Sequence, residues 1–132
     1  GPRARYLGFE LVVRPGRAIV VSDPMMLRSI LDNLVSNAVR YTDRGRVLVA
    51  ARPRGSEMEL QVWDTGPGIA DELIPQIFIP YRRFDDRQTR HDEGQGLGLA
   101  LARKQAELLG HPLNVRSRVG HGSVFALRVP KA

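Results

Sequence analysis

Apolar and polar residues recur along this chain with periods that predict most of its secondary structure. Two short β-rich runs, 11–13 and 18–21, flank a Pro-Gly turn at 14–17, which predicts a hairpin. The runs 46–52 and 57–64 flank a second turn with proline and glycine, and the later run alternates apolar with polar residues. Such alternation predicts strands of a sheet with one buried face.

Helical spacing marks two longer segments. Asp23 is a suitable N-cap, Pro24 stands at the first helical position, and apolar residues recur three and four positions apart as far as about Tyr41. This pattern predicts a helix. Residues 97–109 repeat the pattern and are followed by a glycine and a proline, which end helices. A short helical turn is predicted near 71–78.

The segment 65–96 has a different character. It holds glycines near both of its ends and a polar tract at 82–93, and it is long for a connection. Loops longer than about 12–15 residues in compact domains are usually functional lids or disordered, so we expect a lid here. Strands at 113–118 and 123–129 are expected to close the fold.

Length and composition indicate a folded single domain over residues 1–132. The chain has 132 residues, of which 42% are apolar and 26% charged, as in globular proteins. No apolar run reaches the length of a membrane span, and the N-terminus lacks the long apolar stretch that is typical of a signal peptide. We therefore expect a cytoplasmic domain whose parent protein could be anchored in a membrane. Gly1-Pro2 resembles the remnant of a cleaved tag, which suggests a piece excised from a longer protein.

Charge and metal-ligating residues narrow the chemistry only in part. Cysteine is absent and the three histidines lack zinc-type spacing, which leaves oxygen ligands for any metal. The net charge is +6, from 20 basic and 14 acidic residues. A basic balance suits nucleic acid, an acidic protein face, a membrane surface or nucleotide phosphates, and composition does not choose among them.

Polar side chains recur on one face of the first predicted helix. Asn33 and Asn37 are four residues apart, and Arg40 and Tyr41 follow one turn later. Side chains at this spacing are neighbours on a helix. An asparagine amide oxygen is a neutral ligand for a hard cation that keeps most of its waters and binds phosphate. A solvated helix face is the alternative interpretation.

Two glycine-containing motifs follow. The motif at 64–69, Asp-Thr-Gly-Pro-Gly-Ile, comes directly after a strand. Its aspartate could accept a hydrogen bond from a ligand's amino group, and its glycines allow a close backbone approach; an ordinary turn is the alternative. The motif at 94–99, Gly-Gln-Gly-Leu-Gly-Leu, opens onto a helix, whose free amides favour phosphate. It is neither a Rossmann fingerprint nor a Walker loop.

In this order and spacing, the motifs resemble the ATP-binding catalytic domain of sensor histidine kinases, in the superfamily that includes DNA gyrase B, the ninety-kilodalton heat-shock chaperone and MutL. Residues 31–42 resemble the kinase N box, 64–69 the G1 box, 77–85 the F box, 94–101 the G2 box and 120–125 the last glycine box. The resemblance implies an α/β two-layer sandwich of the Bergerat type. A mixed sheet of about five strands would pack against three helices, with ATP between the helices and a lid.

The resemblance also implies roles for individual residues. Asn37 would coordinate the Mg²⁺ that bridges the phosphates, Arg40 would meet phosphate in place of the usual lysine, and these two are the implied catalytic residues. Asp64 would take the adenine amino group. The residues implied to bind the nucleotide are Asn33, Asn37, Arg40, Tyr41, Asp64, Gly66, Gly68, Ile69, Arg83, Gly94, Gly96, Leu97, Gly98, Leu99 and Ser123.

The implied function is to bind Mg-ATP and present its γ-phosphate to a histidine on a separate dimerisation and phosphoacceptor domain, with a response regulator downstream and no nucleic acid. His91, His111 and His121 do not fit as the phosphoacceptor, because the family places that histidine on an upstream helix. Two alternatives remain. One is a gyrase- or MutL-like ATPase switch, whose N-box glutamate is missing here, and the other is a non-catalytic basic module that binds acidic partners or nucleic acid.

Overall fold

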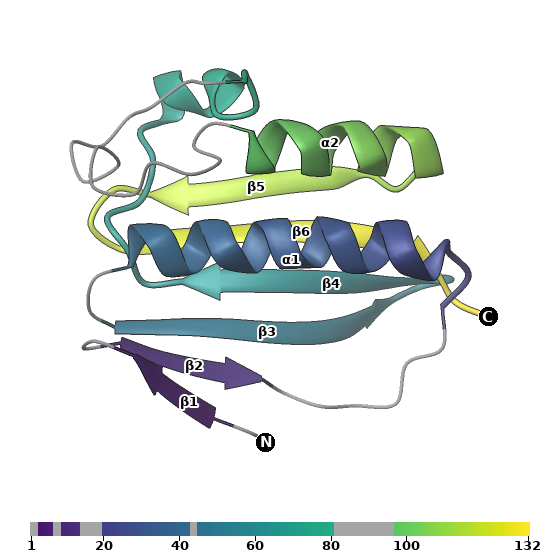
Figure 1. Ribbon diagram of the computed structural model, residues 1–132, viewed down its shortest axis with the longest axis horizontal. Coiled ribbons are helices and arrows are strands. Elements are labelled where there is room, and N and C mark those ends of the chain that lie inside the picture. The colour runs from purple at the N-terminus through teal and green to yellow at the C-terminus, as the bar shows by residue number, and fades with distance from the viewer. Residues whose placement is uncertain (1–2, 7–8, 14–19, 43–44, 81–96) are drawn as a thin grey trace.

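The computed structural model describes residues 3–6, 9–13, 20–42, 45–80 and 97–132, and these form a sheet with helices packed on one of its faces (Figure 1). The strands are β1 (Arg3–Tyr6), β2 (Phe9–Val13), β3 (Gly45–Arg54), β4 (Glu57–Asp64), β5 (Leu113–Arg118) and β6 (Gly122–Pro130). Their order in the six-stranded sheet is β1-β2-β3-β4-β6-β5. The β2–β3 pair is parallel and the other pairs are antiparallel, so the sheet is mixed, as expected.

Two α-helices and one 3-10 helix lie among the described residues: α1 (Pro24–Tyr41), α2 (Gly98–Leu109) and η1 (Asp71–Gln76). The α1 helix begins where the sequence predicts. The Asp23 side chain accepts a hydrogen bond from the amide of Met26 at 2.9 Å, with Pro24 in the first turn. The α2 helix ends at Gly110, whose φ of +73° is the left-handed cap that glycine adopts without strain. None of the described helices is long and apolar enough to cross a membrane.

The predicted hairpin between 11–13 and 18–21 is wrong. The strand β2 instead pairs with β1 on one side and with β3 on the other, and Val20 makes only an isolated bridge with Lys131. Local sequence favours pairing with the next β-rich run, whereas both edges of β2 are taken by other strands. The strand β1 was not predicted, and the sheet has six strands rather than about five. Residues 14–19 and the second half of the predicted lid, 81–96, lie outside the described residues.

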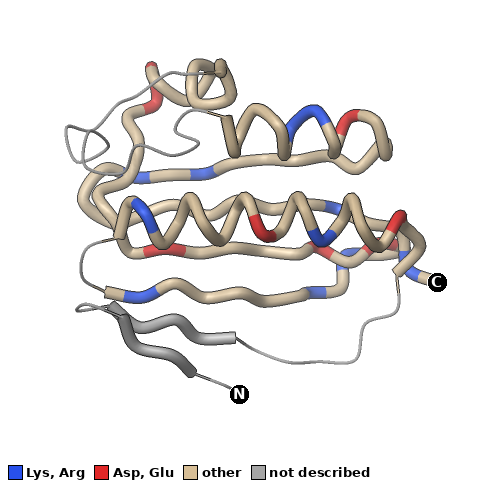
Figure 2. Tube along the Cα trace, in the orientation of Figure 1, with Lys and Arg blue, Asp and Glu red and all other residues tan. Residues whose placement is uncertain are grey.

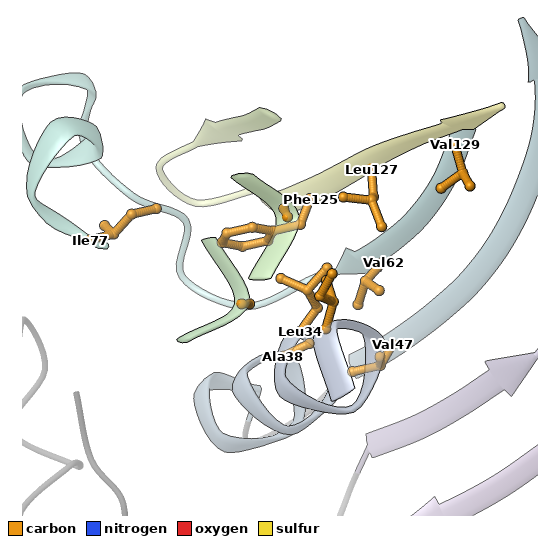
Figure 3. Packing of buried hydrophobic residues seen from close by; sticks show 11 residues of the cluster. Leu34, Ala38, Val47, Val62, Ile77, Phe125, Leu127 and Val129 are labelled. Carbon is orange, nitrogen blue, oxygen red and sulfur yellow. The ribbon is translucent and has the colours of Figure 1, made fainter. Parts of the chain in front are cut away.

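The hydrophobic core lies between the helices and the sheet (Figure 3). The α1 helix contributes three residues spaced four apart, and β6 contributes three alternate residues. These spacings place side chains on one face of a helix and on one face of a strand. The fully buried apolar side chains come from five different elements, α1, α2, β3, β4 and β6, so the two layers form one core. Its members are Ile30, Leu34, Ala38, Val47, Val62, Ile77, Ala102, Ala106, Phe125, Leu127 and Val129.

Candidate nucleotide-binding site

A cavity of about 430 Å³ opens between α1, the start of α2, the segment after β4 and the end of β6. This volume lies within the range typical of small-molecule sites. One of its walls is polar and comes from α1, whereas the opposite wall is largely apolar. The residues that line it are Asn33, Ser36, Asn37, Arg40, Tyr41, Asp64, Pro67, Gly68, Ile69, Ala70, Leu73, Ile77, Leu97, Gly98, Leu99, Leu101, Ser123 and Phe125.

The α1 wall carries the asparagines that the sequence singled out. Asn33 and Asn37 both line the cavity, so the polar stripe of this helix faces the pocket rather than open solvent. A Cβ atom on Gly98 would lie 3.4 Å from Asn33 Oδ1, which places the first residue of α2 directly against the asparagine. The two helices therefore meet at a polar junction, where amide oxygens and helix-terminal amides are side by side.

The N-terminus of α2 lies at the cavity. Its N-cap residue, Leu97, offers no side-chain hydrogen bond, and the first turn holds no acidic residue. Gly98 and Leu99 line the cavity. Uncapped amides and the positive end of the helix dipole favour an anion, above all a phosphate. Arg40 is the basic residue of the described cavity lining, and it adds a positive charge to the same region.

Asp64 lies at the opposite end of the cavity. It is the last residue of β4, it is only 8% exposed, and its Oδ1 accepts a hydrogen bond from the amide of Gly66 at 2.9 Å. Burial raises the pKa of this carboxyl, and hydrogen bonds from the backbone of Gly66 and Ser123 oppose that rise. The result is a desolvated acceptor at the cavity wall, suited to a ligand's amino group.

The loop after Asp64 is held against the β5–β6 hairpin. The Ile69 amide donates to Ser117 Oγ at 2.7 Å, and the Gly120 amide donates to the Pro67 carbonyl at 2.8 Å. Gly68 has φ of +78°, and a Cβ atom there would collide with the Arg118 carbonyl. Only glycine fits both the dihedral angle and the close approach, so this glycine is required for the loop to dock.

Most of the predicted site residues meet in this one cavity. Those that line it are Asn33, Asn37, Arg40, Tyr41, Asp64, Gly68, Ile69, Leu97, Gly98, Leu99 and Ser123. Gly66 is not among the lining residues, but its amide donates a hydrogen bond to the Asp64 carboxylate, which does line the cavity. Arg83, Gly94 and Gly96 lie outside the described residues. Of the F box, Ile77 lines the cavity and Phe78 packs edge-on against Phe125 with ring centroids 6.3 Å apart.

Sequence reasoning missed several wall residues. Ser36, Leu73 and Phe125 line the cavity, and each had a usable signal. Ser36 lies one turn from Asn33, Leu73 is in the predicted helical turn, and Phe125 is two residues from Ser123 on the same face of a strand. Ser117 had no such signal, because its contacts depend on which strands pair.

The comparison with protein families is unambiguous. Residues 22–132 match the family described as "Histidine kinase-, DNA gyrase B-, and HSP90-like ATPase", so the chain belongs to this family of ATPases. Within the family it is the catalytic domain of a sensor histidine kinase, since its relatives are kinases of that type. AtsR of Burkholderia thailandensis is 37% identical over 132 residues, which cover 97% of this chain and 22% of AtsR.

Other relatives support the same assignment. CikA of Synechococcus elongatus, a circadian input-output histidine kinase, is 40% identical over 111 residues, or 83% of this chain and 15% of CikA. The chain thus spans less than a quarter of the length of these relatives. Among solved structures, the catalytic domain of the histidine kinase ThkA has a TM-score of 0.73 at 28% identity, covering 94% of this chain and 78% of that one. Full-length ShkA in complex with AMPPNP has a TM-score of 0.76 at 29% identity, covering 95% of this chain and 26% of ShkA.

Proposed function

We propose that this domain binds Mg-ATP in the cavity and presents the γ-phosphate for transfer to a histidine on a separate helical domain of the same protein. The observation that carries the proposal is the meeting of the Asn33–Asn37 stripe with the uncapped N-terminus of α2 at one end of the cavity, and of buried Asp64 at the other. A nucleotide has the matching polarity, with phosphates at one end and a base at the other.

The polar end suits the phosphates and their metal ion. Asn37 would hold Mg²⁺ through its amide oxygen, Asn33 would contact a phosphate or its water, and Arg40 would offset phosphate charge. No cluster of three or more acidic, histidine or cysteine side chains exists among the described residues. One amide ligand fits an ion bound mainly through phosphates and water. When bound, Mg²⁺ supplies positive charge that offsets the charge of the phosphates.

The base end suits adenine. Asp64 would accept a hydrogen bond from the exocyclic amino group, while Gly66, Gly68 and Ile69 shape the wall and Tyr41 packs beside the base. At the phosphate end, Gly96, Leu97 and Gly98 of the G2 box would bind the phosphates through their backbone amides. Gly94, Leu99, Arg83 and Ser123 complete the proposed binding set. Leu97 and Leu101 are exposed apolar residues at the cavity wall and offer a surface for the helical phosphoacceptor domain.

Among the described residues, the phosphate end of the cavity holds no carboxylate that could activate water. Asp32 is the only acidic residue of α1, and it points into solvent, where it pairs with Arg28 at 3.8 Å with a side chain 72% exposed. Asp64 is the only carboxylate among the described residues that line the cavity. A gyrase- or MutL-like hydrolase would need a general base near the phosphates, so the site supports transfer to an external acceptor.

We place the domain in the cytoplasm, where ATP is available, with a response regulator as the final phosphate acceptor.

Calorimetric titration with ATP and Mg²⁺ tests the proposal. We expect binding that weakens when the metal is chelated, and that falls at least about tenfold in Asn37→Ala and in Asp64→Ala, because each removes a polar contact made only by the nucleotide complex. Asp32→Ala is the matched control on the same helix and should bind as the wild type does. The domain alone should show little ATP hydrolysis, and adding the parent protein's phosphoacceptor domain should yield phosphohistidine. Absence of ATP binding, or binding indifferent to both variants, contradicts the proposal.

A further inference from the structure

Ser117 belongs to none of the sequence motifs, yet its side chain makes three hydrogen bonds near the base end of the cavity, where Asp64 lies. It belongs to β5, the edge strand of the sheet, and faces Ser123 of β6 in register. Its Oγ accepts a hydrogen bond from the Ile69 amide at 2.7 Å, lies 3.0 Å from the Gly122 carbonyl oxygen and lies 2.7 Å from Ser123 Oγ. One hydroxyl thus joins the loop that follows Asp64 to the strand that carries Ser123.

The three contacts fix the direction of two protons. A serine hydroxyl has one proton to donate and two lone pairs that accept. The Ile69 amide can only donate and the Gly122 carbonyl can only accept. All three contacts are therefore satisfied at once only when Ser117 donates to Gly122, and Ser123 donates to Ser117. In that arrangement the Ser123 proton is committed, and Ser123 offers the cavity only lone pairs.

Asp64 and Ser123 share the same end of the cavity. They are paired in register across β4 and β6, which sets their side chains on the same face of the sheet about 5 Å apart. Ser123 is 8% exposed and lines the cavity together with Asp64. An ionised carboxylate is also an acceptor only. The base end is thereby a pair of fixed acceptors, not a surface that can reorient to suit any ligand.

We propose that Ser117 is a positioning residue that determines nucleotide specificity by holding the Ser123 hydroxyl in one hydrogen-bond polarity. This inference rests on the proposed function. A hydroxyl with a committed proton discriminates between base groups that exchange donor and acceptor, whereas a free hydroxyl rotates to suit either group. A pair of fixed acceptors suits the exocyclic amino group of adenine, which has two N–H donors, and repels the carbonyl oxygen that hypoxanthine carries at the same position.

The test compares the affinities for ATP and inosine triphosphate, each with Mg²⁺, in wild type and in Ser117→Ala. We expect wild type to prefer ATP and Ser117→Ala to lose about three- to tenfold of that preference, the value of one hydrogen bond. Ser117→Thr keeps a hydroxyl and should keep the preference. Asn114→Ala, an exposed residue of the same strand, is the matched control and should also keep it.

A double-variant cycle separates this role from a structural one. In a Ser123→Ala background, Ser117→Ala should not change the ratio of the two affinities any further, because the hydroxyl that it orients is gone. An unchanged ratio in Ser117→Ala, or an equal change in both backgrounds, overturns the inference while leaving ATP binding intact. Wild type that binds neither nucleotide overturns the proposed function as well. If Ser117→Ala does not fold, Ser117→Cys, with its weaker donor and acceptor, should lower the preference in the same direction.

Discussion

Asp64, which the proposed function assigns to nucleotide binding, lowers the stability of the domain when no nucleotide is bound. Its carboxyl is 8% exposed, and burial raises its pKa. The raised pKa means that ionised Asp64 is less favourable in the folded domain than in the unfolded chain. No neighbouring cation among the causes of the shift offsets this cost, and only two backbone amides do. We attribute the charge to the nucleotide that the proposed function places here, since the core does not stabilise it.

Asp64→Asn should stabilise the empty domain at neutral pH and weaken ATP binding. An acid whose folded pKa is raised destabilises the fold above that pKa, and the effect disappears below the ordinary value of 3.8, where the group is protonated in both states. Denaturant unfolding of both proteins at pH 7 and near pH 3.5 measures this: the advantage of the variant should shrink at the lower pH. Equal stability of the two proteins at pH 7 contradicts the prediction.

At the scale of elements, the cavity depends on segments docking onto one another. The loop after β4 is tied to β3 through the Thr65 hydroxyl, which accepts from the Arg46 amide at 2.8 Å. It is tied to the β5–β6 hairpin through Ile69 and Gly120. Because β3 and the β5–β6 hairpin both hold the loop, its conformation depends on these contacts as well as on its own sequence. A change that undocks it should affect the nucleotide site more than the sheet.

Gly68→Ala should destabilise the domain more than Gly55→Ala. Both glycines have positive φ, +78° and +62°, but a Cβ atom on Gly68 would meet the Arg118 carbonyl, whereas one on Gly55 would have nothing within 4 Å. Gly55→Ala should therefore cost only the backbone strain of about 1–2 kcal/mol. Gly68→Ala should cost more and should also weaken ATP binding. Denaturant unfolding and calorimetry measure the two effects; equal losses of stability in both variants contradict the docking geometry.

At the scale of the whole molecule, the basic side chains of the described residues lie on both the helices and the sheet (Figure 2). Arg54 and Arg128 pair with buried Glu59 at 3.6 and 3.3 Å on the far end of the sheet from Asp64. A hydrogen bond from Gln61, assisted by the two arginines, lowers the pKa of Glu59 despite its burial. Among the described residues, Arg28, Arg54, Arg103 and Arg128 therefore take part in ion pairs within the fold.

The ends of the two helices are joined through a buried histidine. His111, just after α2, bonds to Ser22, just before α1, with 2.8 Å between Nε2 and Oγ. Burial lowers the pKa of His111, and the charge of Glu57 partly opposes this shift. A histidine with a lowered folded pKa takes up protons more readily in the unfolded chain. The stability of the domain should therefore fall as the pH drops through the ordinary histidine value of 6.5.

Chemical unfolding between pH 7.5 and 5.5 checks this expectation. His111→Asn should lose the part of the pH dependence that His111 causes, so its unfolding free energy should change less over this range than that of the wild type. His121→Asn, at an exposed turn position, is the matched control and should retain the wild-type dependence. The same slope in all three proteins rules out His111 as the source.

Much of the fold could be predicted from local pattern. The bounds of α1, β4 and β5 follow from period and capping, because burial of one face imposes the same period on sequence and structure. The hairpin prediction failed because strand pairing is non-local, and β2 finds its partners in β1 and β3. Likewise, the asparagine stripe of α1 was visible in the sequence, but a solvated face would have looked the same.

The sequence by itself determined the chemistry that is available: amide ligands on a helix, an aspartate that ends a strand and glycines that open a helix. Only the tertiary structure decided that these groups face a single cavity, that Asp32 points away from it, and that Ser117 commits the proton of Ser123. The physical reason is that residue type and period fix what each element can bury or bind. The distances between groups on different elements arise only when the helices and the sheet pack.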